Sequence, residues 1–139
     1  MEYGVIGEHL THSFSKEIHN LITDYNYEIK EIPKNELGKF MDERPFKAIN
    51  VTIPYKQDVI PYLSYISPQA KAIHAVNTIV NKNGKLYGYN TDYFGMSSLI
   101  EKIGLTLKGK KVLILGTGGT SLTARLIAKD ANAKEVYRV

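Results

Sequence analysis

The spacing of apolar positions changes repeatedly along the chain between the two-residue period of strands and the longer period of helices. Up to about residue 104, this pattern predicts strands that alternate with helices. The expected strands span residues 3–7, 27–32, 46–53, 75–80 and 85–89, and the expected helices follow residues 15, 35, 68 and 92. Such alternation is typical of the α/β class. We therefore expect a mostly parallel sheet with helices on both faces.

Turn and cap residues support these limits. Ser15 and Asn35 are expected N-caps, and Ser67–Pro68 is a start signal for a short helix. Asn83–Gly84 separates the last two expected strands, and it predicts a hairpin because both residues readily adopt a positive φ. Gly104 follows the last of these helices as an expected C-cap.

The character of the chain changes at Lys108. Residues 110–115 form a continuous apolar strand, which is typical of buried parallel strands. Residues 116–119 then open a helix that runs to about residue 129, and residues 135–139 read as a further strand. One strand–helix–strand unit cannot cover both faces of its own sheet, so this is the first βαβ unit of an incomplete Rossmann domain. The expected domains are residues 1–104 and 105–139.

Composition narrows the class of protein. The 139 residues are 43% hydrophobic and 23% charged, which excludes disorder, collagen and coiled coil. The net charge of +4 mildly favours anionic ligands. The lysines are dispersed and no nucleic-acid module is recognised, so a nucleic-acid role is the weakest option. Apolar runs such as residues 112–115 are too short to span a membrane, and we expect a cytoplasmic protein without a membrane partner.

Two classes of site are excluded by residue type. The chain has no cysteine, so a disulfide, a thiolate metal site and a cysteine nucleophile are impossible. Its four histidines are scattered without the spacing of metal ligands, and we expect no metal.

A glycine-rich turn is the first candidate site. Gly116, Thr117, Gly118 and Gly119 follow an expected strand and open an expected helix, where backbone amides and the helix dipole hold a pyrophosphate. Ala124 would let this helix lie close to the strand. A purely structural turn is the alternative, and a P-loop is excluded because no Gly-Lys-Ser or Gly-Lys-Thr follows.

Polar residues at strand ends form the second candidate. Asn50, Thr52 and Lys56 lie at the end of one expected strand, and Asp92 follows another, while Asn77 lies on the strand between them. Ligands of open α/β sheets gather at such ends. A lysine beside a carboxylate in a partly dry cleft can exchange a proton with a substrate. Taken alone, Lys56 would read as a solvated surface lysine.

The turn His12–Ser15 is the third candidate. Ser13 and Ser15 precede a helix, and their hydroxyls, with the free amides of the helix start, can bind a carboxylate. A plain capping role is equally consistent with the local sequence. Neither His12 nor His19 has a carboxylate at the spacing of a catalytic triad.

Five segments together resemble the amino-terminal part of the shikimate dehydrogenase family. They occur in the family's order and at its usual intervals, and they read GEHLTHSFSKEIHN, NVTIPYK, AVNT, GYNTDYFG and GTGG. The resemblance implies NADPH-dependent reduction of 3-dehydroshikimate to shikimate, in the route to aromatic amino acids. It also implies that the cofactor domain continues beyond Val139.

The resemblance also implies residue roles. Lys56 and Asp92 match the family's catalytic pair. Ser13 and Ser15 would bind the substrate carboxylate, and the ring hydroxyls would be held by Asn50, Thr52, Lys56, Asn77 and Asp92. The glycine turn, residues 116–119, would hold NADP.

Three matters stay open at this point. One alternative is an isolated substrate-binding module without catalysis, and another is a quinate or shikimate dehydrogenase that prefers NAD. The residues that select NADP are expected beyond Val139, with Arg138 inside the preceding strand. A homodimer is a further possibility.

Overall fold

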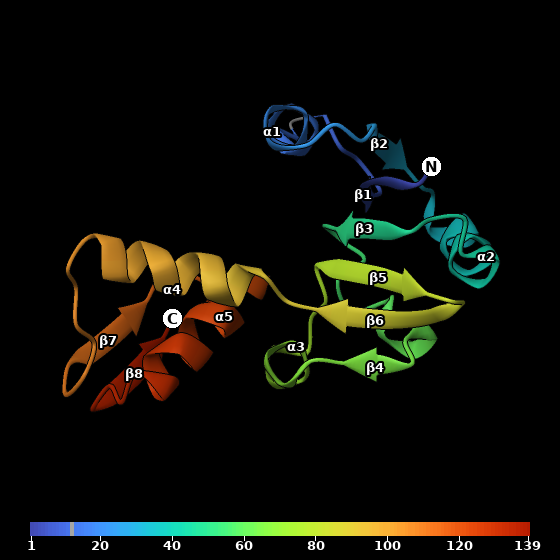
Figure 1. The fold of residues 1–139 in the computed structure, drawn as a ribbon. Helices are drawn as coiled ribbons and strands as arrows, with labels where there is room; N and C mark the ends of the chain where they lie inside the picture. Colours follow the sequence, from blue (N-terminus) through green and yellow to red (C-terminus); the bar gives the residue numbers. More distant parts are fainter. Residues whose placement is uncertain (12) are drawn as a thin grey trace.

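The computed structural model describes residues 1–11 and 13–139, and this part of the chain contains two sheets (Figure 1). The strands of the large sheet are β1 (Tyr3–Gly7), β2 (Tyr27–Glu31), β3 (Ala48–Val51), β4 (Tyr65–Ile66), β5 (Thr78–Lys82) and β6 (Lys85–Tyr89), and those of the small sheet are β7 (Lys111–Ile114) and β8 (Glu135–Arg138). The helices are α1 (Ser15–Ile22), α2 (Leu37–Glu43), α3 (Pro68–Ile73), α4 (Asp92–Lys102) and α5 (Gly119–Asp130), with 3₁₀ turns at Lys34–Glu36 and Ile60–Tyr62.

The large sheet is mixed, with the strand order β2-β1-β3-β5-β6-β4. Its parallel pairs are β1–β2, β1–β3 and β4–β6, whereas β5 runs antiparallel to both β3 and β6. The β5–β6 hairpin turns at Asn83 and Gly84, whose φ values are +52° and +81°. The expected α/β class and this hairpin are therefore confirmed.

One face of the large sheet carries the hydrophobic core. Alternate strand residues point to this face because side chains alternate along a strand. They pack with α2 and with the segment that follows β3, in a buried cluster that includes Ile6, Ile49, Val51, Ile79, Leu86, Phe40, Met41, Tyr55 and Val59. The opposite face carries Tyr27, Asn50 and Thr78, so polar strand residues collect there.

Two expected caps are wrong. Ser15 is the first residue of α1, whose N-cap is Phe14, and the Ser13 Oγ accepts a hydrogen bond from the Ser15 amide at 3.4 Å. Asn35 lies inside a 3₁₀ turn that precedes α2, and the N-cap of α2 is Glu36. The Ser67 start signal is confirmed, because its side chain accepts from the Ala70 amide at 3.3 Å.

Two expected strands have the wrong limits. The strand expected over residues 46–53 spans Ala48–Val51, and the one expected over residues 75–80 spans Thr78–Lys82. Ala75 and Val76 stay outside the ladder because their amides bond elsewhere; the Val76 amide donates to the Lys56 carbonyl at 2.7 Å. Strand β4 was not expected, and its two residues lie beside β6.

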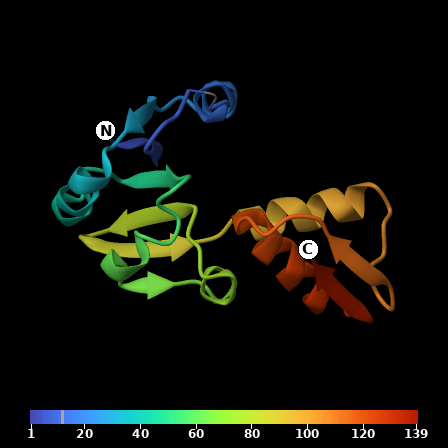
Figure 2. The same ribbon diagram turned by 180° about the vertical axis from the view of Figure 1, so that it is seen from behind.

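The second unit has the expected strand–helix–strand order. Strands β7 and β8 pair in parallel on either side of α5 in the chain, and Arg138 lies within β8 as expected. Helices α4 and α5 pack together, apart from the large sheet, as Figure 2 shows from behind. Leu113 of β7 is 61% exposed rather than buried, because this unit leaves one face of its sheet open within the described residues. No described helix has the length and apolar character to cross a membrane.

Candidate functional site

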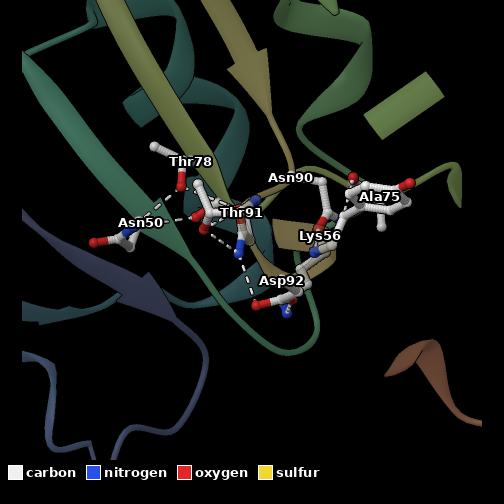
Figure 3. Close-up of polar contacts among 9 residues, drawn as sticks. Asn50, Lys56, Ala75, Thr78, Asn90, Thr91 and Asp92 are labelled. Atoms are coloured by element: carbon white, nitrogen blue, oxygen red, sulfur yellow. Dashed lines mark hydrogen bonds and ion pairs between the residues drawn. The ribbon is translucent and has the colours of Figure 1, made fainter. Parts of the chain in front are cut away.

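The Lys56 and Asp92 side chains meet although they are distant in sequence. The Lys56 Nζ donates to the Asp92 Oδ2 at 2.7 Å, and Figure 3 shows the two side chains pointing toward one another. The side chains are 30% and 43% exposed, so the pair lies at the rim of a cleft rather than in the core. The cleft is a cavity of about 300 Å³ that Thr52, Asn90 and residues of α5 also line.

The Lys56 backbone is held by the segment that follows β3. Its carbonyl accepts the Val76 amide at 2.7 Å. The neighbouring Tyr55 ring is fully buried, and its hydroxyl donates to the Ile32 carbonyl. These two contacts hold the Lys56 backbone and the neighbouring Tyr55 side chain in place, and the lysine side chain extends from this segment into the cleft.

Two asparagines fix the start of α4, and one of them, Asn77, contacts Asp92 directly. Asn77 Nδ2 donates to the Asp92 Oδ1 at 2.9 Å, while its Oδ1 accepts the Thr91 amide at 2.8 Å. Asn90 is buried; its Nδ2 donates to the Ala75 carbonyl at 3.0 Å, and its Oδ1 accepts the Tyr93 amide. One carboxylate oxygen of Asp92 is therefore held by Asn77 and the other by Lys56, which fixes the plane of the carboxylate.

Asn50 and Thr78 lie beside this pair on neighbouring strands. They are direct partners across β3 and β5, and Asn50 Nδ2 donates to the Thr78 Oγ1 at 3.2 Å. Thr78 in turn donates to the Asn77 Oδ1 at 3.0 Å. Asn50 and the polar residues of the AVNT segment thus form one hydrogen-bonded group (Figure 3). Thr52 follows β3 and stays outside this group, although it lines the cavity of Lys56.

The two serines line an adjoining cavity. It measures about 430 Å³, and its lining includes Ser13, Ser15, Phe14 and Ile18. Thr52 and Ile53 line this cavity and the Lys56 cavity alike, so the serine turn and the charged pair share one wall. His12, which belongs to the same turn, lies outside the described residues.

Three contributors to this group were missed by sequence reasoning. Thr78 and Thr91 were given no role, although they flank Asn77 and Asp92 in the AVNT and NTD segments. Tyr27 donates to the Asn50 Oδ1 at 2.5 Å, from the first residue of β2. No local signal marks Tyr27, because it reaches Asn50 only through the pairing of β1 with both β2 and β3.

The Tyr27 hydroxyl is strongly biased toward its neutral form. Burial raises the pKa of Tyr27 to about 12, against the opposing effect of a hydrogen bond with Ser15. An unfolded tyrosine titrates near pH 10. Between pH about 10 and about 12 the folded state therefore holds more protons, and stability falls as pH rises.

We expect Tyr27→Phe to weaken this alkaline loss of stability. In the wild type, the contribution of the neutral Tyr27 hydroxyl to the free energy of unfolding is complete below pH about 10. It is lost between pH about 10 and about 12, by up to about 1 kcal/mol per pH unit. Urea unfolding of both proteins at pH about 9 and about 11.5 measures the difference, with the other tyrosines acting equally in both. Equal alkaline losses in the two proteins would contradict the burial of this hydroxyl.

The glycine turn faces the same cleft. Gly119 and Thr120, at the start of α5, line the cavity of Lys56 and Asp92. Gly116 has a φ of +113°, which favours glycine, and a Cβ added at Gly116, Gly118 or Gly119 would meet nothing within 4 Å. The turn thus presents backbone to open space at a helix start, which fits the diphosphate of a dinucleotide. Among residues 1–11 and 13–139, no cluster of three acidic or histidine side chains could hold a metal ion.

Comparison with known proteins gives one consistent result. The family profile "Shikimate dehydrogenase substrate binding domain" matches residues 5–79. A shikimate dehydrogenase (NADP(+)) of Clostridium beijerinckii is 42% identical over 99% of this chain and 54% of its own length. The chain thus spans about half the length of the curated relatives that it matches.

Solved structures agree with the sequence relatives. Shikimate dehydrogenase 1 from Peptoclostridium difficile superimposes with a TM-score of 0.89 at 39% identity, over 99% of this chain and 54% of that one. Shikimate 5-dehydrogenase from Thermus thermophilus, in complex with NADP(H) and shikimate, gives 0.86 at 30% identity, over 99% and 56% of the two chains. The same fold therefore extends through both sheets of this chain.

Proposed function

The chain belongs to the shikimate dehydrogenase family, and on this premise we propose that it is the amino-terminal part of an enzyme that reversibly reduces 3-dehydroshikimate to shikimate with NADPH. The observation that carries the proposal is the 2.7 Å contact between Lys56 and Asp92 in a cleft that Gly119, the last residue of the glycine turn, also lines. The named activity of the relatives and the complex of one of them with NADP(H) and shikimate support the choice of substrate and cofactor.

The charged pair would act on the carbonyl oxygen of the substrate. Hydride that arrives at a carbonyl carbon leaves negative charge on the oxygen, and NADPH is the group that supplies this hydride when bound. The Lys56 ammonium stabilises the developing alkoxide and donates a proton to it. Asp92 keeps the ammonium aimed, because Asn77 holds its other oxygen in place. In the reverse direction, Lys56 in its neutral amine form accepts the proton of the ring hydroxyl.

The remaining roles follow the geometry of the cleft. Two hydroxyls beside the start of α1 suit the substrate carboxylate, since the helix end there carries free amides and a positive dipole. The donors and acceptors along β3, β5 and the start of α4 suit the ring hydroxyls. We assign the carboxylate to Ser13 and Ser15, the ring hydroxyls to Asn50, Thr52, Lys56, Asn77 and Asp92, and NADP to Gly116, Thr117, Gly118 and Gly119.

The assay is the formation of NADPH from shikimate and NADP, followed by absorbance with the complete protein that contains this chain. We expect turnover with NADP to exceed turnover with NAD. Faster turnover with NAD would favour the quinate or shikimate dehydrogenase reading instead. Calorimetric binding of shikimate without any turnover would favour a substrate-binding module.

Three further features belong to the proposal. We divide the chain into a substrate-binding domain over residues 1–104 and the start of a cofactor domain over residues 105–139, and we place the protein in the cytoplasm. We also propose a homodimer, because β2 lies at a sheet edge and its Ile29 side chain is 40% exposed. We expect the complete protein to sediment with twice the mass of one complete polypeptide, and sedimentation as a monomer would contradict the proposal.

A further inference from the structure

A single phenol lies at the far end of the hydrogen-bonded group that reaches the charged pair. We propose that Tyr27 is a positioning residue, whose hydroxyl sets the orientation of the Asn50 side chain and, through it, the substrate-binding face of the cleft. The inference rests on the proposed function, because the affected ligand is the substrate of that same site. Tyr27 itself is 2% exposed and is not a lining residue of the Lys56 cavity.

A series of hydrogen bonds connects Tyr27 to the charged pair, and in each of them the donor is the residue nearer to Tyr27. Tyr27 donates to the Asn50 Oδ1 at 2.5 Å, and Asn50 Nδ2 donates to the Thr78 Oγ1 at 3.2 Å. Thr78 donates to the Asn77 Oδ1 at 3.0 Å, and Asn77 Nδ2 donates to the Asp92 Oδ1 at 2.9 Å. Asp92 accepts at both ends, because Lys56 donates to its other oxygen. Loss of the first donor therefore affects Asn50 most directly, while the contacts among Asn77, Asp92 and Lys56 keep both partners.

The orientation of the Asn50 amide follows from its neighbours. Thr78 spends its one hydroxyl proton on Asn77, so its oxygen must accept from Asn50. The Asn77 carbonyl, 3.4 Å from the Asn50 Nδ2, can only accept. Both partners face the amide nitrogen, at 3.2 and 3.4 Å, so the amide oxygen faces Tyr27, which must donate. The Tyr27 bond, at 2.5 Å, is the shortest of the three contacts that hold this amide.

The Tyr27 hydroxyl also lies near the other half of the cleft. The Ser15 side chain at the start of α1 is close enough to oppose the rise in the pKa of Tyr27. Ser15 lines the cavity proposed for the carboxylate, whereas Asn50 belongs to the group proposed for the ring hydroxyls. The hydroxyl that holds Asn50 is thus placed near both parts of the proposed site.

A neighbouring ring restrains the Tyr27 ring. It stacks on the His19 ring with centroids 3.9 Å apart and planes inclined by 11°. The Tyr25 ring also lies beside His19, and its hydroxyl contacts the His19 Nδ1 at 2.8 Å. Tyr25 is 36% exposed, and its hydroxyl bonds to His19 rather than to a residue proposed to bind substrate. It is therefore a matched control for the loss of one phenolic hydroxyl in the same cluster.

Removal of the Tyr27 hydroxyl should weaken substrate binding and leave the chemical step intact. In Tyr27→Phe the ring and its stacking remain, but the Asn50 Oδ1 loses the hydroxyl that donates to it. We expect the KM for shikimate to rise about tenfold, which corresponds to about 1.4 kcal/mol. The kcat should change less than about twofold, because Lys56, Asp92 and Asn77 keep their mutual contacts. The KM for NADP should not change.

The experiment compares wild type, Tyr27→Phe and Tyr25→Phe in the complete protein. A raised KM for shikimate in Tyr27→Phe alone supports the positioning role. An unchanged KM, an equal rise in both variants, or a loss confined to kcat overturns it.

A second measurement separates this inference from the proposed function. The side-chain amide protons of Asn50 report its orientation by NMR without any substrate. Slow exchange with water in wild type and Tyr25→Phe, with fast exchange in Tyr27→Phe, supports the positioning of Asn50 even if shikimate is not turned over. Equal exchange in all three proteins overturns it. Absence of shikimate turnover in wild type, by contrast, overturns only the proposed function.

Discussion

Replacing Lys56 by alanine should lower the kcat for shikimate oxidation by about three orders of magnitude, within the range of a lost proton donor and acceptor. The reason is geometric, because the Nζ that leaves is the group that Asp92 holds at 2.7 Å in the cleft. None of the hydrogen bonds described above joins the Lys56 ammonium to Ser13, Ser15 or Asn50. Shikimate should therefore still bind, and calorimetry on the complete variant measures this separately from steady-state turnover.

A matched variant keeps the Lys56 result interpretable. Lys71 is an exposed lysine on α3, so Lys71→Ala removes the same charge outside the cleft. We expect wild-type turnover from it. Undiminished turnover in Lys56→Ala would remove this lysine from the mechanism. Complete loss of shikimate binding would show that Lys56 acts mainly by holding the substrate and would contradict its role in proton transfer.

The largest expected effect on stability comes from Tyr55→Ala. The Tyr55 ring is fully buried in the main hydrophobic cluster, and its hydroxyl donates to the Ile32 carbonyl. Truncation of a buried aromatic ring leaves a cavity and lowers the free energy of unfolding by about 3–5 kcal/mol. Here it also leaves a buried carbonyl without its partner. Chemical denaturation of the variant measures the total.

Two companion variants separate these causes. Tyr55→Phe keeps the ring and should cost about 1–3 kcal/mol, the range for an unsatisfied buried polar group. Tyr65 is 44% exposed, so Tyr65→Ala should cost less than about 1 kcal/mol. A cost for Tyr55→Ala no larger than that for Tyr65→Ala would contradict the burial of this ring.

Local chemistry explains which parts of the fold could be predicted from the sequence. Asn83–Gly84 demands a turn because both residues sit at positive φ, and Ser67–Pro68 supplies a capping oxygen and a fixed φ to one helix start. The sequence could predict that Lys56, after β3, lies near Asp92, after β6, because ligand sites of α/β sheets gather at such strand ends. The proximity of Lys56 and Asp92 follows from that arrangement.

Contacts between distant segments explain what could not be predicted. Residues 75–77 read as the start of a strand, yet the Ala75 and Val76 amides bond to the Ala70 and Lys56 carbonyls, outside a regular ladder. Ser15 has the chemistry of a cap, but the preceding Phe14 occupies that position in the backbone. In the sequence, Tyr27 cannot be told from other aromatic residues of strands. Only the pairing of β1 with β2 and β3 brings the Asn50 Oδ1 to 2.5 Å from its hydroxyl.

A crystal structure of the complete protein with shikimate bound tests the central claim most directly. We expect the substrate carboxylate to lie between Ser13 and Ser15, with the reactive ring hydroxyl within hydrogen-bond distance of both the Lys56 Nζ and an Asp92 oxygen. A substrate bound with that hydroxyl away from Lys56, while Lys56 and Asp92 remain paired, would contradict the proposed chemistry of this cleft.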